Sequence, residues 1–309
     1  ELTITNIDDY SDGLGLKTKV VYGGVGRQDQ VDSIALGLDI LVATPGRLLD
    51  LIKTGDINFK ALEVFVLDEA DTMLDMGFFK DVQSIISKLP KNRQTLLFSA
   101  TMPPKIEILA EAILTDPTKI QITAKTVTID LINQSVYHLE KSNKVPLLFN
   151  ILKESDYKKV LIFCKTKPGA DIIVNALEEA SITAASLHSG KTQAAREEAL
   201  QHFKDANLTV LVATDVAARG IDVDNITLVI NYNLPEDPRN YIHRIGRTAR
   251  AGKSGMAISF AVENDITLLK SIEKSIGQVI PVVTEQPFHK EFAEAPKKVK
   301  KKVKKRNRR

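Results

Sequence analysis

Short apolar runs alternate with helical patterns along most of the chain, and this alternation restricts the possible folds more than any other feature. In the first part, the apolar runs are Lys19–Tyr22, Asp39–Ala43, Val64–Leu67, Thr95–Phe98 and Lys119–Ile122. Between two of these runs, the residues at helical spacing are Val82, Ile85, Ile86 and Leu89. Strands that alternate with helices predict a parallel sheet covered by helices on both sides.

The same alternation starts again after a polar, threonine-rich stretch at residues 124–132. The apolar runs there are Ser135–Leu139, Val160–Phe163, Ala184–Leu187, Val210–Ala213, Leu228–Ile230 and Met256–Phe260. A helix face carries Ala195, Ala199 and Phe203. We therefore predict an α/β fold with two tandem parallel-sheet domains, 1–123 and 133–283, joined by a linker over 124–132. A basic tail over 284–309 is predicted to be disordered.

Charge is distributed unevenly along the 309 residues, although the net charge is only +3. Residues 297–309 carry ten Lys or Arg and no acidic residue. Removing these ten from the 42 basic residues leaves 32 against 39 acidic ones, so the remainder has a net charge of −7. Such a basic block repels itself and is typical of an arm that binds nucleic acid. A tail that only increases solubility is the alternative.

The sequence carries no sign of a membrane or secretory segment. No apolar run approaches the roughly 20 residues of a membrane-spanning helix, and the chain opens with polar residues and without Met, which suggests processing or a fragment. The single cysteine, Cys164, follows the apolar run Val160–Phe163 and is predicted to be buried and inert. One cysteine cannot form an intrachain disulfide, which favours a cytoplasmic protein.

Three carboxylates, Asp68, Glu69 and Asp71, follow the apolar run Val64–Leu67. That run reads as a strand buried on both faces, and ligands of open α/β sheets bind at the carboxyl ends of such strands. Clustered carboxylates repel one another unless a cation lies between them, and Mg²⁺ prefers oxygen ligands. In this interpretation Asp68 holds the metal, directly or through water, and Glu69 activates the water that attacks a γ-phosphate. The alternative is a solvated acidic turn that caps the next helix.

Two further segments at strand ends carry features of a phosphate site. Gly23 and Gly24 would let a backbone approach closely and expose N–H groups, although an ordinary glycine turn has the same composition. Thr44 as a cap and Pro45 as the first helical residue would leave free N–H groups at the positive end of a helix. Arg47 adds a charged donor. A plain capped helix start is the alternative.

Pairs of polar side chains follow two other strands. Ser99 and Thr101 end the strand after the acidic one, where they either hydrogen-bond the acidic cluster or cap a turn. Gln193 and Arg196 lie at the start of a helix with a spacing of three, which places them on one face.

The end of the second half is rich in arginine. Thr214 ends a strand, and a later segment carries Arg244, Arg247 and Arg250 at intervals of three, which predicts three arginines on one helix face. Their mutual repulsion is costly unless an anion lies opposite, and the guanidinium group suits a phosphate. A solvated basic helix, the alternative, fits poorly with the apolar residues between the arginines.

The segment Gly190-Lys191-Thr192 imitates the end of a phosphate-binding loop. The full pattern needs a glycine five residues before Gly190, and that position is Ala185. The sequence therefore contains no complete phosphate-binding loop.

Taken together, these motifs resemble the DEAD-box family of ATP-dependent RNA helicases over about residues 1–283. The resemblance implies two tandem RecA-like domains, ATP and Mg²⁺ as cofactors, RNA as the partner, and local unwinding of short duplexes coupled to ATP hydrolysis. It implies that the two domains close on ATP and RNA and reopen after hydrolysis. Contacts to the RNA backbone position a strand without reading its sequence.

The resemblance also implies a role for individual residues. Asp68 and Glu69 would serve Mg²⁺ and the attacking water, and Arg247 and Arg250 would reach the γ-phosphate. The residues implied in ATP binding or coupling are Asp71, Ser99, Thr101, Asp222 at the ribose, and His243. The residues implied in holding the RNA backbone are Gly23, Gly24, Thr44, Arg47, Gln193, Arg196, Thr214 and Gly220.

The sequence departs from the family at its front. The family places an adenine-reading segment, a phosphate-binding loop and a Pro-Thr-Arg-Glu-Leu-Ala segment ahead of this region, and only Glu1-Leu2 could correspond to the last of these. We therefore expect a fragment whose first domain is incomplete, marginally stable and weak in ATP binding. A non-catalytic RNA-binding protein and a DNA translocase of the wider superfamily are the competing hypotheses.

Overall fold

The computed structural model describes residues 2–121, 131–153, 157–218, 223, 225–249 and 254–292, with side chains from residue 7 onward. The chain divides into two compact units, Glu1–Ile122 and Thr123–Arg309, which we call the first and the second unit. The predicted linker lies almost entirely outside the described residues, so its limits stay a prediction.

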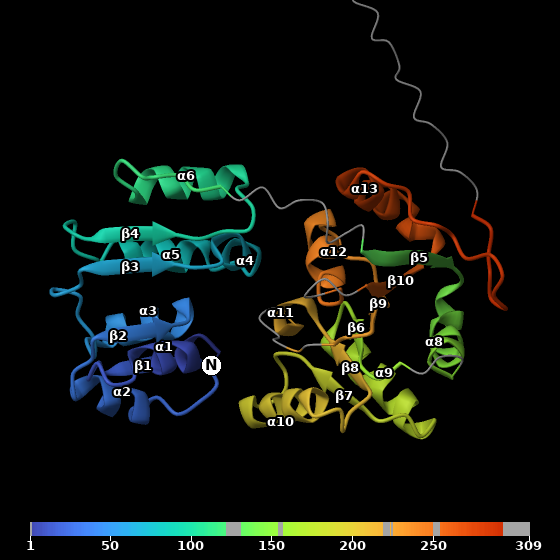
Figure 1. Ribbon diagram of the computed structural model, residues 1–309, viewed down its shortest axis with the longest axis horizontal. Helices are drawn as coiled ribbons and strands as arrows, with labels where there is room; N and C mark the ends of the chain where they lie inside the picture. The colour runs from blue at the N-terminus through green and yellow to red at the C-terminus, as the bar shows by residue number, and fades with distance from the viewer. Residues whose placement is uncertain are drawn as a thin grey trace, which may run out of the picture. The chain divides into compact units, whose positions relative to one another are not determined.

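The first unit contains four strands in two separate parallel pairs, β1 with β2 and β3 with β4 (Figure 1). Its elements are α1 (Leu2–Ser11), β1 (Thr18–Val21), α2 (Gln28–Ala35), β2 (Ile40–Ala43), α3 (Pro45–Thr54), β3 (Val64–Leu67), α4 (Ala70–Asp75), α5 (Phe79–Ile86), β4 (Gln94–Leu97) and α6 (Pro104–Ile113). Four of the five predicted strands are present, each within one residue of its predicted limits.

Two expectations for the first unit are wrong. The strands do not form one sheet, because no described strand joins the β1–β2 pair to the β3–β4 pair. The strand expected over Lys119–Ile122 is absent from residues 119–121, while Ile122 lies outside the described part. Ile120 is 84% exposed, so this segment has no neighbour on which a strand could pair and pack.

Strand β3 is present at its predicted limits but is not buried on both faces. Leu67 packs with Val82 and Ile106 in the core cluster of this half of the unit. Val64 and Val66 point the other way and are 47% and 51% exposed, because no described element covers that face. The apolar run therefore predicted the position of the strand correctly, but the prediction that both of its faces are buried is wrong.

The second unit is a six-stranded, fully parallel sheet with strand order β5-β10-β9-β6-β8-β7 (Figure 1). Its strands are β5 (Ile132–His138), β6 (Val160–Phe163), β7 (Ala184–Leu187), β8 (Val210–Ala213), β9 (Leu228–Asn231) and β10 (Gly255–Ala261). Its helices are η1 (Lys141–Asn143), α8 (Lys144–Lys153), α9 (Lys167–Glu179), α10 (Gln193–Lys204), α11 (Asp215–Ala218), α12 (Pro238–Ile245), η3 (Glu263–Asp265) and α13 (Ile266–Ile276). All six predicted strands are present.

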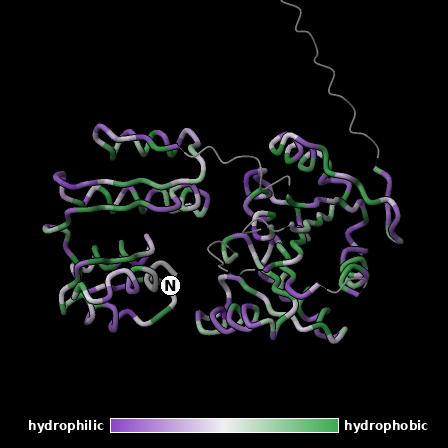
Figure 2. Tube along the Cα trace, viewed as in Figure 1, coloured by the Kyte–Doolittle hydropathy of each residue, from purple (hydrophilic) through white to green (hydrophobic). Residues whose placement is uncertain are grey.

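Helices cover both faces of this sheet, as the strand–helix alternation predicts. Residues of α8 and α9 pack with Val160 and Ile162 on one face, while α10 and α11 pack with Leu161 and Phe163 on the other. The alternating orientation of strand side chains sends neighbouring residues to opposite faces. Because both faces are covered, β6 and β8 are apolar throughout, and most of the central sheet is visible as green tube in Figure 2.

The C-terminal segment continues to pack against the sheet beyond α13. The Val136 N–H of edge strand β5 donates to the Pro281 carbonyl at 2.9 Å, and the Val283 N–H donates to the Val136 carbonyl at 2.9 Å. Lys290 forms an ion pair with Glu140 at 2.6 Å. Residues 284–292, which we expected to belong to the disordered tail, instead lie against β5. The rest of the predicted tail, 293–309, lies outside the described residues.

The structure also tests the predictions for the single cysteine and for membrane-spanning helices. Cys164 is buried at 3% exposure, as predicted, and burial raises the pKa of its thiol, which keeps it in the unreactive protonated form. Within the described part of the chain, each helix is too short or too polar to cross a bilayer.

Candidate functional site

The acidic turn after β3 presents two exposed carboxylates. Asp68 and Glu69 are both exposed, and neither forms an ion pair with another described residue. The Glu69 N–H donates to an Asp68 carboxylate oxygen at 2.8 Å, which leaves the other lone pairs of that group available. Glu69 has a φ of +48°, in the left-handed region that non-glycine residues seldom adopt. The turn therefore holds Glu69 in a backbone conformation that a residue with a side chain does not favour.

Asp71 belongs to the same turn but is buried, at 5% exposure. Its carboxylate accepts hydrogen bonds from the Thr101 N–H at 2.8 Å, from the Thr101 hydroxyl at 2.7 Å and from the Thr72 N–H at 3.0 Å. Burial alone would raise the pKa of Asp71, but these hydrogen bonds outweigh it and lower the pKa below its usual value. Asp71 is therefore held as a carboxylate that joins the turn after β3 to the turn after β4.

Ser99 completes this connection. Its hydroxyl oxygen accepts from the Asp71 N–H at 3.2 Å and donates to the Thr101 carbonyl at 2.7 Å. Of the two alternatives left open by the sequence, hydrogen bonding to the acidic cluster is the one observed. The ends of β3 and β4 are thus connected by side-chain hydrogen bonds as well as by the backbone hydrogen bonds between the two strands.

The donor set of this turn fits Mg²⁺. Carboxylate oxygens are the ligands that Mg²⁺ takes, usually one or two of them, with water and substrate phosphate completing the shell. In the described part of the chain, no group of three or more metal-binding side chains is present. Asp68 alone could therefore anchor the ion, with the remaining ligands coming from outside the protein.

The glycine turn and the start of α3 lie at the carboxyl end of the β1–β2 pair. Gly24 has a φ of +87°, which requires glycine at that position, and Pro45 is the first residue of α3. Thr44 precedes the helix as expected, but its hydroxyl makes no capping hydrogen bond. The N–H groups at the start of α3 are therefore not capped by Thr44.

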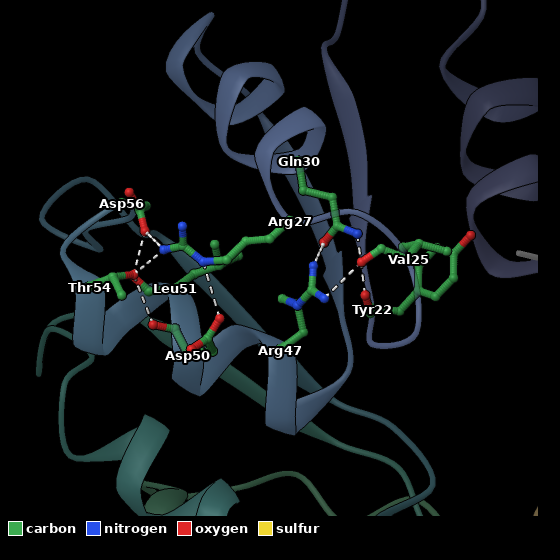
Figure 3. A network of polar contacts seen from close by, with 9 residues as sticks. All are labelled: Tyr22, Val25, Arg27, Gln30, Arg47, Asp50, Leu51, Thr54 and Asp56. Carbon is green, nitrogen blue, oxygen red and sulfur yellow. Dashed lines mark hydrogen bonds and ion pairs between the residues drawn. The ribbon is translucent and has the colours of Figure 1, made fainter. Parts of the chain in front are cut away.

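Arg47 is fastened to this turn by a residue that the sequence analysis did not single out. Its guanidinium donates to the Gln30 side-chain oxygen at 2.9 Å and to the Val25 carbonyl at 3.1 Å (Figure 3). The Gln30 amide in turn donates to the Tyr22 carbonyl at 3.2 Å. Nothing in the sequence marks Gln30, because a polar residue in the first turn of a helix is ordinary.

In the second unit, Gln193 and Arg196 lie on one face of α10, as predicted. The Arg196 guanidinium donates to the Gln193 side-chain oxygen at 3.0 Å, and the Gln193 amide donates to Glu197 at 2.7 Å. Thr192, part of the false phosphate-loop match, caps α10 by accepting from the Ala195 N–H at 3.2 Å. Thr214 follows β8, and its N–H donates to the Leu187 carbonyl at 3.2 Å.

The three-arginine face predicted for α12 is wrong. The helix ends at Ile245, so Arg247 lies in the following turn, and Arg250 lies outside the described residues. Arg244 is 3% exposed and points into the unit, where it forms a two-point ion pair with Asp215 at 2.6 and 2.7 Å. The regular spacing of the arginines could not show that a carboxylate 29 residues earlier takes up the first of them.

His243 and Arg247 line a hollow of the second unit together with Phe163, Asp215 and Asn240. The hollow therefore brings together His243 and Arg247, two residues to which the family resemblance gives a role in ATP binding or hydrolysis. The implied roles of Asp222, Gly220 and Arg250 fall outside the described residues.

A second cluster missed by the sequence analysis surrounds Asp171 of α9. The carboxylate accepts from the Ser186 hydroxyl at 2.6 Å and from His188 Nε2 at 3.1 Å, and it pairs with Lys191 at 3.1 Å. Burial would raise the pKa of Asp171, but the hydrogen bonds from Ser186, His188 and Lys191 lower it to about 2. The cluster fixes the turn between β7 and α10.

Comparisons with known proteins agree with this arrangement of motifs. Residues 2–109 match the family model described as DEAD/DEAH box helicase, and residues 143–252 match the helicase conserved C-terminal domain. A relative is the DEAD-box ATP-dependent RNA helicase CshA of Bacillus subtilis, 41% identical over 268 residues, which are 86% of this chain and 54% of the relative. The CshA of Streptococcus pneumoniae is 40% identical over 289 residues, 92% of this chain and 55% of the relative. The chain thus spans about half the length of these curated relatives.

Solved structures give the same answer for the fold and the family. The S. cerevisiae Dbp5 bound to RNA and ADP BeF3 superposes with a TM-score of 0.80 at 28% identity, covering 91% of this chain and 74% of that one. A DEAD box protein from the hyperthermophile Methanococcus jannaschii is 38% identical with a TM-score of 0.50, covering 91% of this chain and 77% of that one. The two units are therefore RecA-like parallel α/β folds. The chain belongs to the DEAD-box family of ATP-dependent RNA helicases.

Proposed function

We propose that this chain is part of an ATP-dependent RNA helicase that separates short RNA duplexes locally, coupled to ATP hydrolysis. The observation that carries the proposal is the buried Asp71 carboxylate, which joins the acidic turn to Thr101 by two hydrogen bonds. A displacement of the acidic turn during hydrolysis would reach the Ser99–Thr101 turn directly. Membership of the DEAD-box family supports the same function.

The acidic turn would carry the chemistry. Asp68 would hold Mg²⁺, directly or through water, and Glu69 would orient the attacking water and accept its proton. A bound Mg²⁺ would neutralise charge on the phosphates. Arg247 and Arg250 are proposed to stabilise the charge that develops on the γ-phosphate.

The remaining nucleotide contacts are assigned by the same proposal. Asp222 would accept a hydrogen bond from the ribose, and His243 would take part in coupling ATP binding to the RNA-bound state. Asp71, Ser99 and Thr101 would transmit the change, as their hydrogen bonds allow.

RNA would be held through its sugar–phosphate backbone. The proposed backbone contacts are Gly23, Gly24, Thr44 and Arg47 in the first unit and Gln193, Arg196, Thr214 and Gly220 in the second. Such contacts are independent of sequence, and contacts to the 2′-hydroxyl would favour RNA over DNA. We place the protein in the cytoplasm, a proposal supported by its single, buried cysteine.

The rate of hydrolysis by this chain alone is proposed to be low, because its sequence contains no complete phosphate-binding loop. A non-catalytic RNA-binding protein is the second candidate. The ten basic residues of 297–309 favour it, since they supply affinity for RNA without any nucleotide.

The first test is RNA-stimulated ATP hydrolysis by the 309-residue chain beside Glu69→Gln and the control Glu63→Gln, an exposed glutamate before β3. We expect slow hydrolysis that RNA accelerates, that Glu63→Gln retains, and that Glu69→Gln lowers by about 10²-fold, the usual contribution of a general base. Hydrolysis that survives Glu69→Gln would contradict the role of Glu69.

A competition between RNA and DNA of the same sequence separates the candidates further. Preference for RNA that increases with ATP supports the helicase. Equal affinity for DNA would contradict the assignment of RNA, and RNA binding that ignores ATP would favour the non-catalytic alternative.

A further inference from the structure

Gln30 touches both parts of the RNA-backbone site proposed for the first unit. Its side-chain oxygen accepts from the Arg47 guanidinium at 2.9 Å, and its amide donates to the Tyr22 carbonyl at 3.2 Å (Figure 3). One side chain of α2 therefore connects the start of α3 with the first residue of the glycine turn.

The hydrogen bond fixes the orientation of Arg47. The guanidinium has five N–H donors in one plane, and it directs one to Gln30 and one to the Val25 carbonyl at 3.1 Å. Two contacts from different residues define that plane, and three donors are left for another acceptor. The side chain is half-buried, so Arg47 is held in place before any anion arrives.

The same contacts fix the glycine turn at both of its ends. The Tyr22 carbonyl is held by Gln30 and the Val25 carbonyl by Arg47, with Gly23 and Gly24 between them. In the described part of the chain, the N–H groups of these two glycines have no hydrogen-bond partner. The turn thus offers backbone donors near a guanidinium whose position is set by the same network.

We propose that Gln30 is a positioning residue for the RNA backbone, acting through Arg47 and the glycine turn without touching RNA itself. The proposal rests on the RNA binding proposed above. Its physical basis is preorganisation: a donor set fixed in advance loses less freedom when a phosphate binds. If Gln30 only stabilised α2, its effect on RNA affinity would be independent of Arg47.

A double-mutant cycle tests this dependence. The 309-residue chain, Gln30→Ala, Arg47→Ala and the double variant are titrated against a labelled single-stranded RNA by fluorescence anisotropy. The titration uses about 0.3 M salt, because binding by the basic block through charge alone weakens steeply with salt. Gln28→Ala is the matched control, since Gln28 lies on the same helix and, among the residues that the structure describes, its side chain bonds Asp32 alone, at 2.8 Å.

We expect Arg47→Ala to weaken RNA binding about tenfold and Gln30→Ala about fivefold, the range for losing a charge-assisted contact or its alignment. The double variant should bind no more weakly than Arg47→Ala, and Gln28→Ala should bind like the native chain. If Gln30→Ala lowers affinity by the same factor with and without Arg47, the positioning role is overturned. An affinity unchanged by Gln30→Ala in the native background would overturn it as well.

The variant Gln30→Glu distinguishes a loss of RNA binding from a loss of folding. The substitution preserves size and the acceptor for Arg47 but loses the amide that donates to the Tyr22 carbonyl. The new ion pair with Arg47 offsets that loss, so we expect a melting temperature close to that of the native chain, while the added charge neutralises Arg47 and should weaken RNA binding more than Gln30→Ala does. RNA binding as tight as that of the native chain would contradict the proposal. If instead the native chain fails to bind RNA, or Arg47→Ala binds as well as it does, the RNA site itself is wrong.

Discussion

Among the individual residues, Asp71 and Asp171 share one physical situation in different units. Each carboxylate lies on a helix that follows a strand, α4 for Asp71 and α9 for Asp171, and each receives hydrogen bonds from a hydroxyl and from at least one further donor. In both, the hydrogen bonds outweigh burial and lower the pKa. Ionised carboxylates therefore hold together turns that the proposed site depends on.

Asp171 allows a prediction with a definite pH window. Its folded pKa is about 2 and its ordinary value 3.8, so the stabilisation it gives is complete above pH 3.8 and is lost as the pH falls toward 2. The melting temperature of the native chain should exceed that of Asp171→Asn by a constant margin from pH 7 to about 4, and the margin should narrow below that. Thermal unfolding followed by circular dichroism measures it, and Asp12→Asn, an exposed aspartate, is the control. A margin independent of pH would contradict the pKa of Asp171.

At the scale of elements, the segment after α13 protects the edge strand of the second unit. It supplies two backbone hydrogen bonds to Val136, the Lys290–Glu140 ion pair and the partly buried Phe288. Exposed strand edges promote association between chains.

A chain that ends after Gly277 should therefore lose about 3 kcal/mol of stability in the second unit, the sum expected for an aromatic side chain and a few hydrogen bonds. It should also aggregate at lower concentration. A chain that ends after Phe292 is the control and should melt like the full chain, because the contacts to β5 are retained. Thermal melts and light scattering measure both. Equal stability of the two truncated chains would show that the segment does not support β5.

At the scale of the whole molecule, the opposite charges of the core and the basic block determine how salt acts. Residues 1–296 carry a net charge of −7 and residues 297–309 carry +10. Affinity for RNA should fall with salt, and replacing the block by glycine and serine should lower the slope of log K against log salt by about 0.7 for each phosphate it neutralises. RNA titrations at four salt concentrations give the slope. A slope that is unchanged by the replacement would exclude the block as an RNA-binding arm.

The fold of the second unit was predictable because its strands are covered on both faces. Runs such as Val160–Phe163 and Val210–Ala213 are apolar throughout and buried throughout, so composition and environment agree. In the first unit Val64–Leu67 is equally apolar, yet Val64 and Val66 are exposed. A local sequence shows that the side chains of a strand are apolar. It cannot show whether another element of the fold packs against them and shields them from water.

The site was predictable to the extent that it follows strand ends. Asp71 and Thr101 lie in different motifs, and they meet because parallel strands end at one edge of a sheet. Arg244 was wrongly placed on one face with Arg247 and Arg250, because its ion pair with Asp215 is not visible in local spacing. Gln30 and Asp171 escaped notice because a polar residue on a helix carries no signal until its partners are known.

The left-handed backbone of Glu69 has a consequence for how this turn can vary. A non-glycine residue in that conformation costs about 1–2 kcal/mol, and glycine at the same position would avoid most of it. The turn is therefore less stable with its carboxylate than without it. Selection for greater stability alone would favour glycine in place of Glu69, and the same substitution would remove the proposed base, so stability and the proposed hydrolysis place opposite demands on this one position.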